Sequence, residues 1–301
     1  RTLSGGEVQR INLTTALGTS LVNTLFVLDE PSIGLHPRDI DRINGVLARL
    51  RDAGNSLLVV EHDPQIMLQA DRILDIGPGP GERGGEIVFY GTPKELVGAA
   101  SRDKKTTSRQ GYRSYNDPAN SLTAKYLSGE LTVAPQPETP SASKRRVPSP
   151  TQGEGQGEGD HIKILGAAEH NLKNIDVNIP LHRLVTITGV SGSGKSTLVN
   201  DILFNALSKI KGNPEEIPGA HRAIHGHEQI DGVVMLDQAP IGKSSRSNPV
   251  SYVGAWDAIR KQFAATKLAK ERGYTPGTFS FNSGNGRCPT CNGSGFEHVE
   301  M

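Results

Sequence analysis

The chain has 301 residues, 35% of them hydrophobic, and a formal charge of only +1 from 33 Lys and Arg against 32 Asp and Glu. At about 150 residues per domain, this length predicts two domains. The charge balance excludes a uniformly basic nucleic-acid-binding protein, no apolar run approaches the roughly 18 residues of a membrane span, and two Cys are too few for a disulfide-rich secreted scaffold. Because the chain opens at Arg1 without an initiator Met, we expect a fragment with both ends missing.

The first hundred residues predict an α/β block. Short apolar runs at 24–28 and 56–60 are typical of buried parallel strands, and residues 38–52 between them carry apolar side chains at helical spacing. The order strand, helix, strand indicates a βαβ unit. The other elements expected in this block are a strand at 72–76, a hairpin at 85–90 and a short helix near 120–128.

A second α/β block follows a Pro- and Gly-rich stretch. Residues 132–160 contain five Pro and the tract GEGQGEG, which predicts a flexible linker. Beyond it we expect antiparallel strands at 161–165 and 173–179, then a buried strand at 184–188 and a helix at 197–210. The sequence thus predicts a first domain over 1–131, a linker over 132–160 and a second domain over 161–301.

Residues 189–197, GVSGSGKST, fit the phosphate-binding pattern G-x-x-x-x-G-K-[ST]. Glycines let backbone N–H groups converge on phosphate oxygens at the start of a helix. Lys195 would reach the β- and γ-phosphates, and the Ser196 hydroxyl would bind Mg²⁺. The alternative is a Gly/Ser-rich turn, but an apolar strand precedes the motif and an amphipathic helix follows it. The nucleotide-binding residues predicted here are Gly189, Ser191, Gly192, Ser193, Gly194, Lys195, Ser196 and Thr197.

The first block carries a capped helix start. Ser4 and Glu7 have the spacing of a capping box, and Gly5 and Gly6 leave backbone amides open to an anion. A plain capped helix without ligand is the alternative.

Polar residues follow both buried strands of the first block. Asp29 and Glu30 come at the carboxyl end of 24–28, where open α/β sheets bind ligands. Asp29 would hold Mg²⁺ through water, and Glu30 would act as general base on the attacking water. His62 follows 56–60, where it could contact a γ-phosphate, although a lone His there is more often structural.

In their order along the chain, these motifs resemble the ABC-type ATPase family, with the signature LSGGE, Walker B, D-loop and H-loop in the first block and Walker A in the second. The resemblance implies an α/β P-loop fold in which ATP lies between the Walker A of one domain and the signature of another. Gln238 matches the Q-loop glutamine that senses Mg²⁺ and the attacking water. Lys195 would then work with the signature, whereas Asp29 and Glu30 would serve a site whose Walker A is missing. We therefore expect the longer protein to be an ATPase and this chain alone to bind ATP weakly and hydrolyse essentially none.

Cys288 and Cys291 form a C-x-x-C motif with trailing glycines, which is half of a zinc site. A structural zinc site needs four ligands, so two remain to be supplied. A redox dithiol and a chaperone-type cysteine repeat are the alternatives. No second signature follows Lys195 in this chain, which predicts that a zinc-binding insertion starts at about residue 250.

Two further segments follow Gln238. The basic loop 243–248 fits a place near the nucleotide or a plain solvated loop equally well. Residues 256–272 predict a basic amphipathic helix whose Trp256, Ile259 and Phe263 pack in a core, with Lys and Arg free to face DNA.

Eight phrases narrow the resemblance to the UvrA family, the damage-recognition subunits of the bacterial excinuclease. They are RTLSGGEVQRINL, VLDEPSIGLHPRD, VVEHD, DIGPGPGERGGEIV, NLKNIDVNIP, TGVSGSGKSTLVNDIL, LDQAPIGKSSRSNPVSY and FSFNSGNGRCPTCNGSG. The resemblance implies a cytoplasmic homodimer that uses ATP, Mg²⁺ and Zn²⁺, binds damaged duplex DNA through its shape, loads UvrB and has no membrane partner. The alternatives are a UvrA-like paralogue without UvrB binding, the ATPase subunit of an ABC transporter, a ribosome-binding ABC protein and a non-catalytic zinc- and DNA-binding protein.

Overall fold

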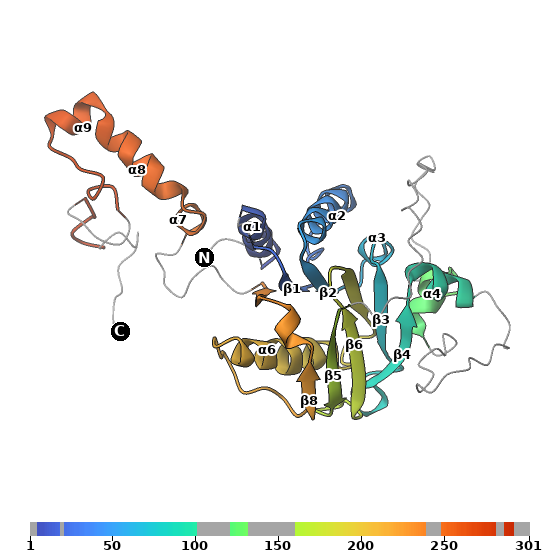
Figure 1. Cartoon of the computed structure of the whole chain (residues 1–301). Coiled ribbons are helices and arrows are strands. Elements are labelled where there is room, and N and C mark those ends of the chain that lie inside the picture. Colours follow the sequence, from blue (N-terminus) through green and yellow to red (C-terminus); the bar gives the residue numbers. More distant parts are fainter. Residues whose placement is uncertain are drawn as a thin grey trace, which may run out of the picture. The chain divides into compact units, whose positions relative to one another are not determined.

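A computed structural model describes residues 5–18, 21–100, 121–131, 160–238, 248–280 and 286–291 (Figure 1). The chain divides into two compact units, one of Ser20–Leu236 and the other of Arg1–Thr19 with Asp237–Met301. The predicted linker lies outside the described residues apart from Asp160. Within the described ranges, no helix is both long and apolar enough to cross a membrane.

The unit Ser20–Leu236 is built on a six-stranded sheet of order β4-β3-β7-β2-β1-β9. Neighbouring strands are parallel except for β3 and β4, which are antiparallel. The strands predicted at 24–28, 56–60, 72–76 and 184–188 are confirmed, whereas the hairpin predicted within 85–90 is wrong, because this segment is one strand that pairs with β3. The strands are β1 (Thr24–Asp29), β2 (Ser56–Val60), β3 (Arg72–Gly77), β4 (Glu86–Gly91), β7 (Leu184–Thr188) and β9 (Gly232–Leu236).

Strands from both sides of residues 132–159 share this sheet. Strand β7 lies between β2 and β3, with Leu184 in register with Leu57 and Val185 with Arg72. Strands β2 and β7 are buried along their whole lengths, so each needs hydrogen-bonding neighbours on both edges. In this chain, therefore, the predicted boundary at 132–160 does not separate the strands of the sheet.

A smaller antiparallel sheet, of order β6-β5-β8, packs with the main one. It consists of β5 (His161–Ala167), β6 (Ile175–Pro180) and β8 (Ala223–His225), and the antiparallel pairing predicted for 161–165 and 173–179 is confirmed. The helix predicted at 197–210 is present as the π-helical η3 (Thr197–Phe204) continued by α6 (Asn205–Ile210).

The core of this unit has two sides because strand side chains alternate. One cluster joins residues such as Leu25 and Leu58 of the main sheet to Ile164 of the small sheet and Leu198 of η3. On the other side, α2 (Pro37–Asp52) contacts β2 and β7. The predicted helix 38–52 is confirmed, and its buried residues are Ile40, Ile43, Leu47 and Leu50.

The remaining helical elements of this unit are short. The helix predicted near 120–128 is confirmed as α5 (Leu122–Leu127). The others are α3 (Pro64–Met67), η1 (Gly81–Arg83), α4 (Pro93–Ala100) and η4 (His227–Gln229).

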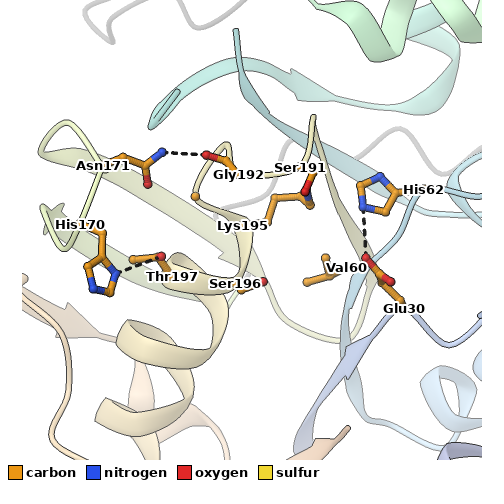
Figure 2. A pocket seen from close by; sticks show the side chains of 11 residues that line it. Glu30, Val60, His62, His170, Asn171, Ser191, Gly192, Lys195, Ser196 and Thr197 are labelled. Carbon is orange, nitrogen blue, oxygen red and sulfur yellow. Dashed lines mark hydrogen bonds and ion pairs between the residues drawn. The ribbon is translucent and has the colours of Figure 1, made fainter. Parts of the chain in front are cut away.

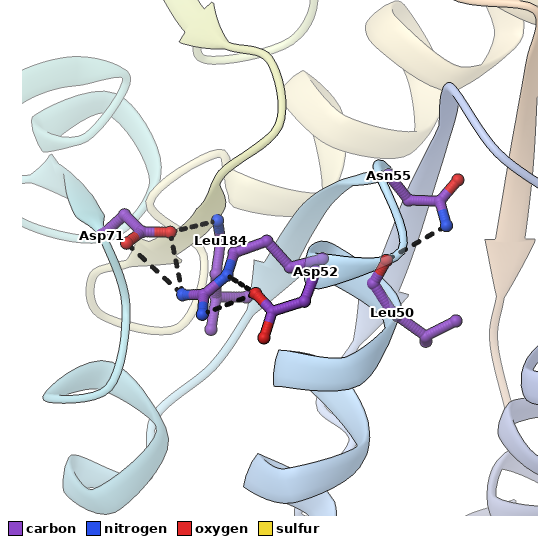
Figure 3. Close-up of polar contacts among 6 residues, drawn as sticks. Leu50, Asp52, Asn55, Asp71 and Leu184 are labelled. Carbon is purple, nitrogen blue, oxygen red and sulfur yellow. Dashed lines mark hydrogen bonds and ion pairs between the residues drawn. The ribbon is translucent and has the colours of Figure 1, made fainter. Parts of the chain in front are cut away.

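A polar network joins the elements at the amino ends of the parallel strands (Figure 3). Asn55 is fully buried; its side chain accepts from Thr24 N at 3.1 Å and donates to Leu21 O at 3.1 Å and Leu50 O at 3.0 Å. Asp71 accepts from Leu184 N at 2.7 Å and pairs with Arg51 at 3.3 Å. These bonds tie together the segments that enter β1, β3 and β7.

The second unit contains α1 (Gly5–Gly18), α7 (Pro249–Tyr252), α8 (Ala255–Ala265) and α9 (Lys267–Glu271). The helix predicted over 256–272 is divided, because Thr266 ends α8 and caps α9 with its hydroxyl, which accepts from Ala269 N. The expected core packing is wrong for Phe263, which is 52% exposed and contacts Phe279 with ring centroids 5.6 Å apart. Residues 243–247 lie outside the described residues.

Candidate nucleotide site

A pocket of about 290 Å³ lies at the carboxyl ends of β1, β2 and β7 (Figure 2). The phosphate loop after β7 supplies one wall, and Glu30 and His62, which follow β1 and β2, supply another. The lining residues are Glu30, Val60, His62, His170, Asn171, Ser191, Gly192, Gly194, Lys195, Ser196 and Thr197.

Strand order brings these residues together. Strands β1, β2 and β7 are adjacent and parallel, so their carboxyl ends meet at one edge of the sheet. The ABC-family resemblance implies different nucleotide sites for Glu30 and Lys195, but in this chain both line the same pocket. The difference arises because β7 inserts between β2 and β3, a pairing between residues more than a hundred positions apart.

Lys195 is a buried basic group at the pocket. Its side chain is almost fully buried, and Nζ donates to Gly189 O at 2.9 Å and Val190 O at 3.0 Å. Burial lowers the pKa of Lys195, and the nearby carboxylates, first Glu30, oppose that shift. A desolvated ammonium at the start of a helix suits a polyanionic phosphate chain. Of the predicted loop residues, Gly189 and Ser193 do not line the pocket, and Ser193 is fully buried behind it.

Glu30 and His62 form a pair on one wall of the pocket. His62 Nε2 lies 3.3 Å from Glu30 Oε1, and both side chains are partly exposed. Glu30 has a left-handed backbone, with φ of 48°, and its N–H bonds to Val60 O at 2.9 Å. A non-glycine residue at positive φ is uncommon and is often found where a side chain must be aimed at a site. The carboxylate is thus held at the pocket, where it could take a proton from water.

Glu61 is a residue of this site that the sequence does not reveal. Its carboxylate is buried at 1% exposure and accepts four hydrogen bonds. Ser32 donates through N at 2.9 Å and Oγ at 3.0 Å, and the backbone N–H groups of His62 and Asp63 donate at 2.8 and 3.0 Å. Glu61 therefore fixes the loop after β1 to the loop that carries His62.

His170 and Asn171 are also missed by the sequence motifs. They lie in the turn between β5 and β6 and line the pocket, where His170 Nδ1 is 3.4 Å from Thr197 Oγ1. No spacing pattern in a single sequence marks this turn, because it reaches the pocket only through the packing of the small sheet.

The other predicted site residues have different places. Asp29 ends β1 and does not line the pocket, although its charge contributes to raising the pKa of Lys195. Gln238 follows β9 in a bend, and Gly5 and Gly6 begin α1; these residues belong to the second unit. Ser4 lies outside the described residues.

Cys288 and Cys291 lie in a short described segment of the second unit. Cys288 is exposed, and hydrogen bonds from the backbone of Cys291 and Thr290 lower its pKa to about 7, which favours the thiolate form that metals bind. Across the described part of the chain, no group of three or more His, Cys, Asp or Glu could hold a metal ion. The described residues thus offer two of four zinc ligands, and zinc binding stays a prediction.

Several of the known proteins to which this chain is similar have the same name and come from different organisms. The chain is 49% identical over 301 residues to UvrABC system protein A of Lactiplantibacillus plantarum, 49% over 300 residues to that of Methanothermobacter thermautotrophicus and 46% over 300 residues to that of Bacillus subtilis. Each match covers 100% of this chain and 28% of the relative.

Along its whole length, this chain is similar to part of UvrA. The resemblance predicted from the motifs is thereby confirmed, and with the mainly parallel sheet it confirms the predicted α/β class of an ABC-type ATPase. The chain spans about a quarter of the length of the UvrA relatives it matches. A crystal structure of UvrA2 from Deinococcus radiodurans is 40% identical, with 99% of this chain and 31% of that chain covered and a TM-score of 0.42. No protein-family model matches the chain.

Proposed function

We propose that this chain is part of an ATP-dependent DNA-damage recognition subunit of a bacterial excinuclease, acting in nucleotide excision repair. The observation that carries the proposal is the pocket in which a phosphate loop with a buried Lys195 meets Glu30 and His62. The similarity to UvrA along the whole chain supports the same function. In the longer protein, we assign 1–131 to the end of one ABC ATPase domain and 161–301 to the start of the next, with a zinc-binding insertion from about residue 250.

At this site each residue has a chemical task. Lys195 and the amide of Gly194 would bind phosphate oxygens, and the Ser196 hydroxyl, with Asp29 through water, would hold Mg²⁺. Mg²⁺, when bound, neutralises charge on the β- and γ-phosphates. Glu30 would accept a proton from the attacking water, with His62 near the γ-phosphate. In the longer protein, we expect Gln238 to act as the Q-loop glutamine that the family resemblance implies. In the longer protein, we expect the signature residues Ser4, Gly5 and Gly6 to act on the same nucleotide as Lys195, as the ABC resemblance implies.

The partners follow from the same proposal. We expect the longer protein to act in the cytoplasm as a homodimer on damaged duplex DNA and to load UvrB. Phosphate contacts would dominate its affinity for DNA and make binding salt-dependent. Cys288 and Cys291 would supply half of a structural zinc site.

The first test is nucleotide binding by this chain. A fluorescent ATP analogue with Mg²⁺ should bind the wild-type chain weakly but measurably. Steady-state ATP turnover should be close to zero, because the ABC resemblance assigns Asp29 and Glu30 to a different site from that of Lys195. Turnover that disappears in Lys195→Ala would contradict the prediction of an inactive chain. Absence of any nucleotide binding would contradict the nucleotide site itself.

The second test concerns the longer protein. ATP-dependent binding to a duplex that contains a lesion should exceed binding to the same duplex without it. Equal affinity for both duplexes in every nucleotide state and salt concentration would argue against damage recognition. Binding of UvrB to the longer protein then separates the main repair subunit from a paralogue that lacks this partner.

A further inference from the structure

The glycine-rich loop 77–85, between β3 and β4, packs against the outer side of the phosphate loop. Gly81 N donates to Gly192 O at 2.9 Å, and Gly85 N donates to Ser193 O at 2.8 Å. Two carbonyl groups of the phosphate loop are therefore held by backbone donors from a segment more than a hundred residues earlier in the chain.

Asn171 completes this contact from the side of the pocket. Its Nδ2 donates to Gly192 O at 3.1 Å (Figure 2) and to Gly81 O at 3.0 Å, so one amide group bridges loop 77–85 and the phosphate loop. Two residues further on, Lys173 N donates to Gly85 O at 3.0 Å. The turn that carries Asn171 is thus bonded to the same loop at two points, Gly81 and Gly85.

The close approach of these backbones requires glycine. A Cβ at Gly85 would lie 1.8 Å from Asn171 O, and the φ of Gly85 is +79°. A Cβ at Gly84 would lie 2.5 Å from Gly79 O and 3.0 Å from Ser193 Cα. The paired glycines therefore allow loop 77–85 to reach the phosphate loop, which accounts for a motif that nucleotide chemistry alone does not explain.

Holding these carbonyls has a consequence for the pocket. A trans peptide is planar, so its C=O and N–H point in opposite directions. The carbonyl of Ser193 is bonded to Gly85, which directs the N–H of Gly194 away from loop 77–85, and Gly194 lines the pocket. The carbonyl of Gly192 is bonded likewise, and the N–H of Ser193 bonds to Val190 O at 3.1 Å, which closes the turn of the loop.

We propose that Asn171 is a positioning residue for phosphate binding, and that with loop 77–85 it holds the phosphate loop in its binding conformation before a nucleoside triphosphate arrives. This inference rests on the proposed nucleotide site. A loop that is already ordered loses less conformational entropy when the phosphate chain binds, so affinity is higher than for a mobile loop.

Asn171→Asp tests the proposal with almost no change of shape. At neutral pH the carboxylate would face the carbonyl oxygens of Gly81 and Gly192 and could donate to neither. Loss of both bonds should weaken binding of the Mg²⁺–ATP analogue about tenfold or more, and Asn171→Ala should weaken it by about fivefold. At pH 4 and below, near the ordinary Asp pKa of about 3.9, the protonated side chain can donate one hydrogen bond again, so the affinity ratio to wild type should shrink. Asn213→Asp, an exposed position outside the pocket lining, is the matched control for charge.

The outcomes separate this inference from the proposed function. If wild type binds and Asn171→Asp binds equally well at neutral pH, the positioning role is overturned while the nucleotide site stands. A weakened variant that does not recover at low pH also overturns it, because a merely structural defect has no such pH profile. If Asn171→Asp does not fold by circular dichroism, the Ala variant decides, and unchanged affinity there overturns the role. If wild type itself does not bind, both the proposed function and this inference fail.

Discussion

At the amino ends of the parallel strands, polar side chains use their hydrogen-bonding groups on the protein's own backbone. Asn55 is fully buried and uses its amide on three backbone groups, and Asp71 bonds to the backbone at the start of β7. At the carboxyl ends, by contrast, Glu30 and His62 keep 38% and 47% of their side-chain surface exposed, around an open pocket. The amino edge therefore stabilises the sheet, whereas the carboxyl edge keeps polar groups available to a ligand.

The largest effect expected is on ligand binding at the carboxyl edge. Lys195→Ala should weaken binding of the Mg²⁺–ATP analogue by about 100-fold or more, because a charge-assisted contact to phosphate is lost. The free energy of unfolding should fall by no more than about 1 kcal/mol, because losing the Nζ bonds to Gly189 O and Val190 O is offset by removing a charge that burial disfavours. Fluorescence titration and urea unfolding measure the two quantities. Unchanged affinity would remove the distinction between the edges.

The amino edge should respond in the opposite sense. Asn55→Ala leaves the buried Thr24 N–H and Leu50 C=O without their partner, so it should lower the free energy of unfolding by about 3 kcal/mol. Nucleotide affinity of the folded protein should stay as in wild type. Asn213→Ala, at an exposed position, is the control and should change stability by less than about 0.5 kcal/mol. A large loss of affinity in Asn55→Ala would mean that the two edges are not independent.

Glu61 tests the limit of this comparison between the two edges, because it is buried like Asn55 but lies at the carboxyl edge. In Glu61→Gln the amide oxygen can accept the three donors that meet at Oε2, which leaves the NH₂ group against Ser32 N–H. Stability should fall by about 1–2 kcal/mol. Hydrogen exchange should become faster at the Ser32 amide but not at those of His62 and Asp63. Ser32→Ala, which removes only the hydroxyl donor, should have a smaller effect; equal exchange rates throughout would contradict the assigned bonds.

The smallest effect expected is a pH dependence from Asp75. Its side chain is buried and accepts from the hydroxyls of Ser121, Thr123 and Thr188, and burial raises its pKa against the effect of those bonds. The folded state therefore keeps the proton to higher pH than the unfolded state. The stability that this provides is full below about pH 4 and is lost as the pH rises through the folded pKa. The free energy of unfolding, measured with urea across this pH range, should fall more steeply in wild type than in Asp75→Asn. Parallel curves for the two proteins would contradict a raised pKa of Asp75.

Much of this molecule follows from local sequence. Strands β1, β2 and β7 are continuous apolar runs, and α2 has apolar residues at helical spacing, because burial on one or both faces imposes those periods. The phosphate loop is equally local, since its glycines, Lys195 and Ser196 must be neighbours in the chain to surround one phosphate group. The division between α8 and α9 is a local feature too, although the amphipathic pattern hides the cap at Thr266.

Only the tertiary structure decides which of these pieces meet. Strand order depends on hydrogen bonds between distant segments, and nothing within β7 specifies that it lies between β2 and β3. That order places Glu30 and His62 in the same pocket as Lys195, and it brings loop 77–85 and Asn171 against the phosphate loop. Glu61 and Asn171 stand in phrases that carry the family resemblance, but the sequence assigns neither of them a role. Their roles exist only through partners that folding brings within hydrogen-bond distance.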